Sequence, residues 1–172
     1  MCRKSPINAL AHFLDQLLRP LVDRASHSTT FLHGTDFLRR FDTYSTSNKD
    51  HFQSMTLLAT FKIQNFYSVV SHNHILDTLG RFLTKHLTHN RLENLTIITI
   101  ENLTELFLNN LSFYYDQNIY RFQKGLPSCL RLSETLGTIF LLEWQIYLLI
   151  KPQMRNEFYG RSVSFSKRIS LI

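Results

Sequence analysis

Most of the side chains with a potential chemical role lie in one segment, residues 113–140. Its first part carries aromatic rings on both sides of a turn-forming sequence, Asp116-Gln117-Asn118. The rings that could stack on bases are those of Tyr114, Tyr115, Tyr120 and Phe122. The basic side chains near them are Arg121, Lys124 and Arg131, which suit phosphate contacts. Two interpretations stay open: a surface that stacks on unpaired bases, or a hairpin that packs one aromatic face into the core.

Other reactive side chains lack the partners that catalysis or metal binding requires. His72-x-His74 and His86-x-x-His89 have chelating spacings, but neither pair has a third acidic or sulfur ligand beside it. Cys129 lacks the flanking signature of a thiol nucleophile, and Ser133 is better explained as a helix N-cap than as a hydrolase serine. We therefore predict no metal site from these residues.

The segment from Phe113 to Phe140 resembles the central part of reverse transcriptases from Penelope-like retroelements. The pattern there is close to F-x-F-N-G-x-x-Y-x-Q-x-x-G-x-x-M-G-S-P-L-S-P-x-x-A-N-I-F. Nine positions match without a gap: Phe113, Tyr115, Tyr120, Gly125, Leu132, Ser133, Leu136, Ile139 and Phe140. Phe122 stands where the family has Gln, and Cys129 stands where it has the second Gly.

The resemblance extends to the segments upstream. The sequence TLLATFKIQNFYSVVSH, from Thr56 to His72, is similar to the family motif L-V-S-F-D-V-V-S-L-F-T-N-I-P. Its aligned residues are Phe61, Phe66, Tyr67 and Val70. The stretch from Ser5 to Phe41 also resembles the family's lead-in helices, so the similarity covers nearly the whole chain.

The resemblance implies a polymerase ancestry but not an intact catalytic centre. Nucleotidyl transfer uses two magnesium ions about 3.5 to 4 Å apart, held by carboxylates. In the family one Asp comes from the upstream motif, where this chain has Lys62, and two come from a Tyr-x-Asp-Asp hairpin. Residues 159–165 resemble the approach to that hairpin, which aligns Ser164 and Phe165 with the two Asp positions. The alternative is that the tail is unrelated or frame-shifted, and on either interpretation the carboxylates are absent.

We therefore expect no intact catalytic residue and no cofactor in this chain, although Mg²⁺ serves the intact family. Nucleotide or template contacts are implied instead for Tyr67, Phe66, Gly125, Phe122 and Arg161. In the family the aromatic residue at the position of Tyr67 packs under the incoming sugar. Glycine at position 125 would let the backbone approach the template, because it has no Cβ. The alternatives are a core aromatic for Tyr67 and a simple turn glycine for Gly125.

The pattern of apolar residues predicts an α+β fold: a polymerase palm-like sheet with packed helices, plus part of the fingers. One partial reverse-transcriptase-like domain spans residues 1–172, with lead-in helices of the fingers in 1–55 and the palm-like part in 56–172. A buried strand over 56–63 is expected to pair with the 113–122 hairpin in one sheet. The helices over 73–87 and 134–150 are expected to pack on one face of that sheet.

Capping residues and apolar spacing locate the individual helices. The first helix carries apolar residues from Leu10 to Leu21 and is expected to bend at Pro20. The second begins behind Thr35 or Asp36, and residues 43–54 are expected to form a loop. The later helices are expected over 73–87 with Asn73 as N-cap, over about 99–111, and over 134–150 with Ser133 as N-cap.

Composition narrows the possible partners and compartments. The formal net charge is +6 and the isoelectric point is near 9.5, which suits nucleic acid or another anionic surface. Only Cys2 and Cys129 are present, so we expect a reducing compartment and no disulfide-linked partner. No charged-then-apolar leader opens the chain, and the apolar run from Leu136 to Ile150 is too short to span a bilayer. An intracellular location, nuclear or cytoplasmic, is therefore expected.

The functional hypothesis is a fragment of a retroelement reverse transcriptase, unable to polymerise alone, that binds RNA template or primer–template weakly and has no membrane partner. The alternative is a non-catalytic nucleic-acid-binding or structural module that keeps the palm-like fold. An unrelated helical DNA-binding protein is disfavoured, because it leaves the ordered motifs unexplained.

Overall fold

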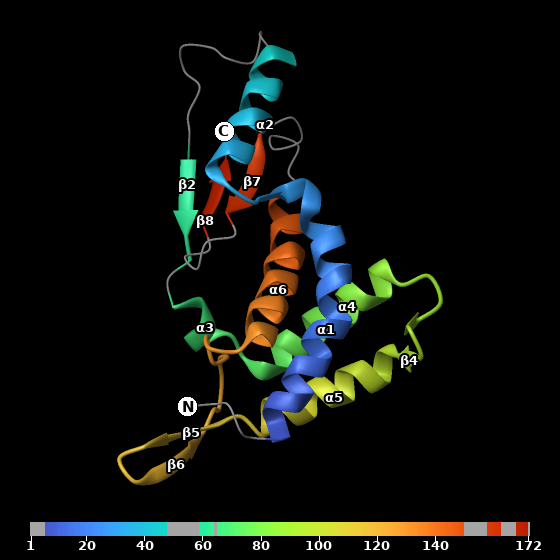
Figure 1. The fold of residues 1–172 in the computed structure, drawn as a ribbon, viewed down its shortest axis with the longest axis vertical. Coiled ribbons are helices and arrows are strands. Elements are labelled where there is room, and N and C mark those ends of the chain that lie inside the picture. Colours follow the sequence, from blue (N-terminus) through green and yellow to red (C-terminus); the bar gives the residue numbers. More distant parts are fainter. Residues whose placement is uncertain (1–5, 48–58, 64, 150–157, 163–167, 172) are drawn as a thin grey trace. The chain divides into compact units, whose positions relative to one another are not determined.

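The computed structural model describes residues 6–47, 59–63, 65–149, 158–162 and 168–171. Contacts divide the chain into two compact units, each made of two separate stretches of sequence. The first unit comprises residues 1–25 and 65–146, and the second comprises residues 26–64 and 147–172. The fold is α+β and dominated by helices with small sheets, as the sequence predicts (Figure 1). The division into a fingers part and a palm part stays a prediction.

The first unit is built mainly from α1 (Pro6–Ser26), α4 (His72–His86), α5 (Ile97–Asn109) and α6 (Arg131–Leu149). Helix α1 continues through Pro20, and its buried side follows the expected three- and four-residue spacing. The largest side chains with almost no exposure all belong to this unit: Leu14, Leu18, Leu79, Phe82, Leu83, Ile100, Phe107, Leu108, Leu132, Leu136 and Ile139. Burial of these apolar side chains is the main force that holds the four helices together.

Three of the predicted helix caps are wrong. The second helix, α2 (Gly34–Ser47), begins before both Thr35 and Asp36, so neither residue is its N-cap. Ser71 caps α4, because its Oγ accepts a hydrogen bond from His74 N at 3.3 Å, and Asn73 already lies inside the helix. Helix α6 begins at Arg131, so Ser133 lies in its first turn. The Ser133 hydroxyl is buried and has no hydrogen-bond partner among the described residues. The chain before Ser133 is already helical, since Ser133 N donates to Leu130 O at 3.1 Å.

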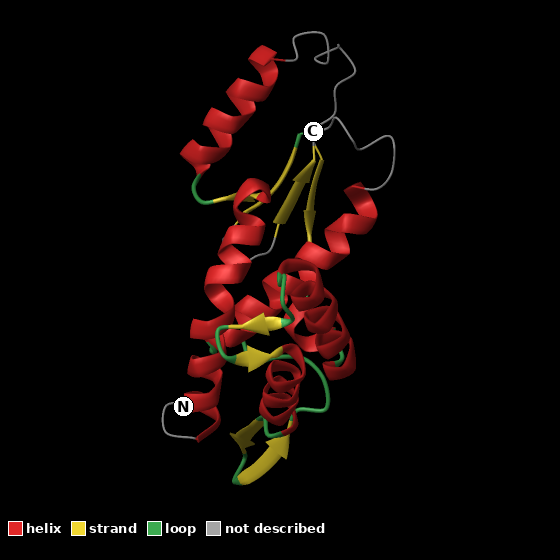
Figure 2. Ribbon diagram, turned by 90° about the vertical axis from the view of Figure 1, so that its right-hand side faces the viewer, coloured by secondary structure: helices red, strands yellow, loops and turns green. Residues whose placement is uncertain are grey.

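Two short hairpins complete the first unit. One pairs β3 (Arg91–Leu92) with β4 (Leu95–Thr96), and the other pairs β5 (Ser112–Tyr115) with β6 (Asn118–Arg121). The β5–β6 hairpin is the one predicted from the aromatic segment. Its two turn residues, Asp116 and Gln117, have φ of 46° and 60°, which is the left-handed geometry that matches the twist of paired strands. Figures 1 and 2 show this hairpin projecting from the helices of its unit.

The second unit contains a four-stranded sheet in the order β1-β7-β8-β2. Its strands are β1 (Thr30–Phe31), β7 (Tyr159–Ser162), β8 (Arg168–Leu171) and β2 (Ala59–Lys62). A 3₁₀ turn (His27–Thr29) precedes β1, and α2 (Gly34–Ser47) follows it. An aromatic cluster forms the core of this unit: Phe31 and Phe158, with Phe37, Phe41 and Tyr44 packed against them. Gly160 in β7 lies under the Phe31 ring, where a Cβ would collide with the ring atoms.

The predicted pairing of the 56–63 strand with the aromatic hairpin is wrong. Strand β2 pairs with β8, and β5–β6 forms a separate two-stranded sheet. The backbone partners of β2 come from the end of the chain, in a stretch whose strand the sequence analysis did not predict. The predicted loop at 43–54 is also wrong over 43–47, where α2 continues because Tyr44 packs on Phe158 with ring centroids 5.4 Å apart. Residues 48–54 lie outside the described part of the chain.

Candidate nucleic-acid interface

The short helix α3 (Phe66–Val69) and the loop around Gly125 form one backbone junction in the first unit. Gly125 N donates to Val70 O at 2.7 Å, and Leu126 N donates to Tyr67 O at 2.7 Å. His72 Nε2 donates to Gly125 O at 2.9 Å, because a carbonyl oxygen can only accept. These hydrogen bonds join two segments that are more than fifty positions apart in sequence. We call this region the α3–Gly125 junction.

Gly125 is required at this junction for two reasons. Its φ is +80°, which is unfavourable for any residue with a Cβ. A Cβ would also contact Tyr67 O and would lie 3.1 Å from Ser68 Cα. The glycine therefore lets the loop backbone approach α3. Its predicted role in approaching a template stays a prediction.

Phe66 and Tyr67 have different environments at the start of α3. Phe66 is buried and contacts Phe140 of α6, with ring centroids 5.5 Å apart. Tyr67 is half-buried, and both its burial and the Glu134 carboxylate raise the pKa of its phenol. Tyr67 therefore stays neutral at physiological pH and keeps part of its ring accessible. The structure thus places Phe66 as a core residue and leaves Tyr67 able to contact a ligand.

Asp15 and Glu134, on α1 and α6, already have cationic or hydroxyl partners. Asp15 of α1 accepts hydrogen bonds from Arg19 Nη2 at 3.1 Å and from Thr135 Oγ1 at 2.5 Å. Arg19 Nη2 also lies 3.8 Å from Glu134 Oε2. This network links α1 to the beginning of α6. The described residues include no group of three His, Cys, Asp or Glu side chains placed to hold a metal ion.

The sheet of the second unit contains Lys62, which stands where the resembled family has its first catalytic aspartate. Lys62 ends β2, and it pairs in register with Arg168, which begins the neighbouring antiparallel strand β8. Strands β7 and β8 also pair with each other in antiparallel register. None of the four strands contains Asp or Glu. Ser164 and Phe165 lie outside the described residues.

The remaining predicted contact residues occupy different places. Phe122 is half-buried at the base of the β5–β6 hairpin, with its ring centroid 5.0 Å from that of Phe113. Arg161 is buried in β7 of the second unit, where its Nη2 donates to Thr30 Oγ1 at 3.1 Å and burial lowers the pKa of its guanidinium. The structure therefore joins Phe66, Tyr67 and Gly125 in one junction and puts Arg161 in the other unit. The roles assigned to these residues stay predictions.

One residue of the junction was missed by sequence reasoning. His72 was considered only as half of a metal-binding pair, whereas its imidazole binds the Gly125 carbonyl. No spacing in the sequence indicates this contact, because the two residues come together only through the fold.

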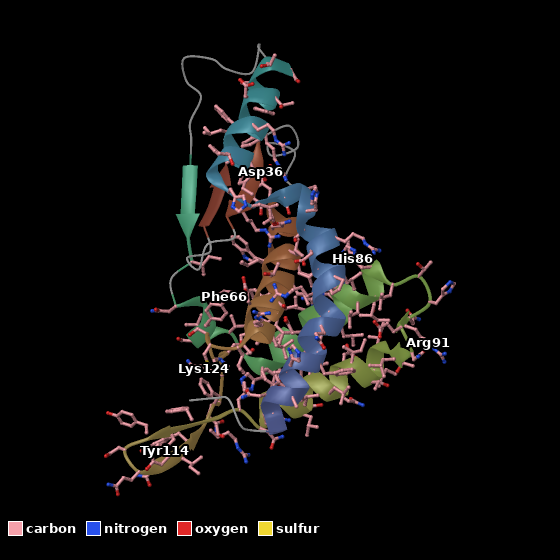
Figure 3. The ribbon with its side chains drawn as sticks, in the orientation of Figure 1. Asp36, Phe66, His86, Arg91, Tyr114 and Lys124 are labelled. Atoms are coloured by element: carbon pink, nitrogen blue, oxygen red, sulfur yellow. The ribbon has the colours of Figure 1, made fainter. Side chains whose placement is uncertain are left out.

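The β5–β6 hairpin is exposed on both faces. Tyr114, Tyr115 and Ile119 keep 71%, 68% and 78% of their surface accessible. Figure 3 shows Tyr114 on the hairpin, with the side chains of this segment spreading away from the other elements of the unit. The interpretation in which one aromatic face packs into the core is therefore wrong.

The fold resembles that of a telomerase. The structure of apo telomerase from Candida tropicalis, truncated from the C-terminal domain, aligns with a TM-score of 0.58 and 10% sequence identity. The alignment covers 98% of this chain and 34% of the telomerase chain. The two chains therefore share a fold over the aligned residues. At this identity the similarity establishes the fold alone, and the chain spans about a third of the telomerase chain that it matches. No family model and no curated protein matches the sequence.

Proposed function

We propose that this chain is a fragment of a retroelement reverse transcriptase that binds primer–template nucleic acid weakly and does not polymerise. The ordered sequence patterns that resemble Penelope-like elements support the origin, and the telomerase-like fold supports the polymerase ancestry. The single observation that carries the proposal is the end of the second unit's sheet. There Lys62 and Arg168 occupy paired positions, and the four strands supply no carboxylate.

Charge explains why this sheet end disfavours catalysis. Magnesium prefers carboxylate and other oxygen ligands. A lysine at the position of the family's first aspartate both removes a ligand and adds a cation, which opposes metal binding. The same positive charge attracts phosphates. Loss of catalysis with retention of some nucleic-acid affinity is therefore the physically consistent outcome.

The α3–Gly125 junction supplies the proposed contact with the primer–template. Tyr67 is half-buried there, so part of the residue stays accessible to a ligand. Lys124, the residue before Gly125, is exposed. One ring and a few cations give a modest affinity that depends on salt, because release of counterions from the phosphates drives most of the binding. We place this binding in the nucleus or cytoplasm, since the sequence has no pairing pattern of cysteines.

Fluorescence anisotropy with a labelled primer–template tests the proposal. We expect weak binding that falls steeply as salt rises, and about a five- to tenfold loss for Tyr67→Leu if the ring contributes a stacking contact. Gln16→Leu is the matched control, because Gln16 is an exposed residue of α1 in the same unit. Tight binding that is indifferent to salt would refute the electrostatic reasoning.

A purely structural module is the second candidate. The observation that favours it is that packing alone explains the residues at the junction: Phe66 fills the core and Gly125 accommodates α3. Absence of any anisotropy change at low salt, with a folded protein by circular dichroism, would select this candidate over the first.

A further inference from the structure

The aromatic side chains of the β5–β6 hairpin are sorted onto two different faces. Cross-strand pairing places Phe113 opposite Tyr120 and Tyr115 opposite Asn118, and these pairs share one face because side chains alternate along a strand. Phe122 continues that face beyond β6. The opposite face carries Tyr114 and Ile119. A cleft of about 630 Å³ beside the hairpin is lined by residues of both faces, Phe113 and Phe122 as well as Tyr114 and Ile119.

The first face forms a continuous row of rings. Phe122 and Phe113 have centroids 5.0 Å apart, Phe113 and Tyr120 are 5.4 Å apart, and Tyr120 and Tyr115 are 6.5 Å apart. We call these four residues the aromatic row. Phe113, Tyr120 and Tyr115 keep 45%, 44% and 68% of their surface accessible. Exposing so many large rings costs solubility, so an exposed row of this kind marks a binding surface.

The charge of the hairpin indicates what binds there. Residues 110–131 contain three basic side chains, Arg121, Lys124 and Arg131, and one acidic side chain, Asp116 at the turn. In the part of the chain that the structure describes, none of the ion pairs includes these three cations. Arg121 and Lys124 are exposed. Arg121 pairs with Ser112 and so lies on the face of Tyr114 and Ile119, whereas Lys124 follows Phe122 by two positions. Rings in a segment that also carries cations outside the ion pairs suit a ligand that presents both flat apolar faces and negative charge.

We propose that the aromatic row binds single-stranded nucleic acid by stacking on unpaired bases, while Lys124, two positions after Phe122, contacts the phosphates. Bases in a duplex cover one another's faces, so only an unpaired strand presents faces to the rings. A second copy of this chain is disfavoured as the occupant, because it would add the same excess of positive charge. The four rings of the aromatic row lie outside the α3–Gly125 junction, although Lys124 adjoins both, and the proposal adds to the function proposed above without requiring that Tyr67 bind.

The test uses the full 172-residue chain and a fluorescein-labelled oligothymidine strand, with a blunt duplex as the second probe. The variant Tyr115→Leu/Tyr120→Leu keeps an apolar surface but removes two ring faces. We expect it to weaken single-strand binding by about tenfold or more, since each stacked base contributes that order of affinity, and to leave duplex binding unchanged. Tyr114→Leu is the matched control, because Tyr114 is as exposed as Tyr115 and lies on the opposite face. We expect it to change affinity less than twofold, and a similar loss in both variants would overturn the assignment to this face.

Further outcomes distinguish single-strand binding by the aromatic row from the function proposed above and from dimerisation. If the double variant binds the single strand like wild type, the proposal is wrong, whatever the protein does with a primer–template. If single-strand binding depends on the aromatic row but the primer–template does not bind, the function proposed above fails and this inference stands. Sedimentation equilibrium tests whether a second copy of this chain binds the aromatic row instead. A dimer that Tyr115→Leu/Tyr120→Leu converts to monomer, with no change in oligothymidine affinity, would show that the row binds a second copy.

Discussion

Replacing Gly125 with alanine should destabilise the first unit by about 1 to 3 kcal/mol, because the chain follows the less costly of two routes. If the junction keeps its geometry, alanine must adopt a φ of +80°, which costs about 1 to 2 kcal/mol. The new Cβ must also be fitted against Tyr67 O and Ser68 Cα, and overpacking against backbone costs about 1 to 3 kcal/mol. If the loop instead moves away, the hydrogen bonds to Val70 O and from His72 are lost, at about 0.5 to 1.5 kcal/mol each. Both routes lead to a loss of the same order.

Urea unfolding measures this loss. Trp144 is the only tryptophan and lies on α6 in the first unit, so its fluorescence reports on the part of the protein that contains the junction. Circular dichroism at the helical band gives the second probe, because two units need not unfold together. We expect a lower midpoint for Gly125→Ala in the tryptophan signal.

Gly80→Ala is the control for this experiment. Gly80 lies within α4 of the same unit, and the nearest obstacle to its Cβ is the carboxylate end of the Glu101 side chain, which can swing aside. Alanine is the better helix former by about 1 kcal/mol, so this variant should be neutral or more stable. The reasoning would be refuted if Gly125→Ala unfolded at the same urea concentration as wild type or as Gly80→Ala.

Three further predictions concern the second unit. Lys62→Asp should not extend a primer with magnesium or manganese, because one carboxylate cannot hold two ions. A gel assay with labelled nucleotides measures this. Templated incorporation by the wild-type chain would show that the motif is misplaced. Gly160→Ala should lower the free energy of unfolding by about 1 to 3 kcal/mol, since its Cβ collides with the Phe31 ring. Urea unfolding followed by circular dichroism measures the change. Gly34→Ala is the control, because the space around its Cβ is open and no such loss is expected. Burial raises the pKa of Tyr159 to about 12 against an opposing effect of Arg161, so the neutral phenol is favoured in the folded state. The contribution of Tyr159 to the free energy of unfolding is therefore present below about pH 10 and lost as pH rises through 12. The loss is at most about 1.4 kcal/mol per pKa unit, and less for a partly exposed ring. The stability of Tyr159→Phe should therefore depend less on pH over this range, and an equal dependence in variant and wild type would contradict the assignment.

Local sequence signals predicted the helices and the aromatic hairpin well. Apolar spacing identified α1, α4, α5 and α6, and the Asp116-Gln117-Asn118 sequence identified the turn of β5–β6. These features depend on neighbours within a few residues, so the sequence carries them directly. The first residue of a helix was harder to predict. Ser71 and Asn73 are both good N-cap residues, and only the folded backbone shows that Ser71 is the cap of α4.

Tertiary structure decided which strands pair and which residues meet. Strand β2 pairs with β8 across more than one hundred residues, and Gly125 meets Tyr67 and His72 from a distant segment. Strand pairing and backbone approach are fixed by burial and hydrogen bonding in the whole molecule, not by the composition of either segment alone. The sequence by itself determined that Lys62 replaces an aspartate of the resembled motif, since this needs only residue identity. Its position beside Arg168 at the end of a sheet came from the fold, because only the folded chain brings residues 62 and 168 to adjacent strands.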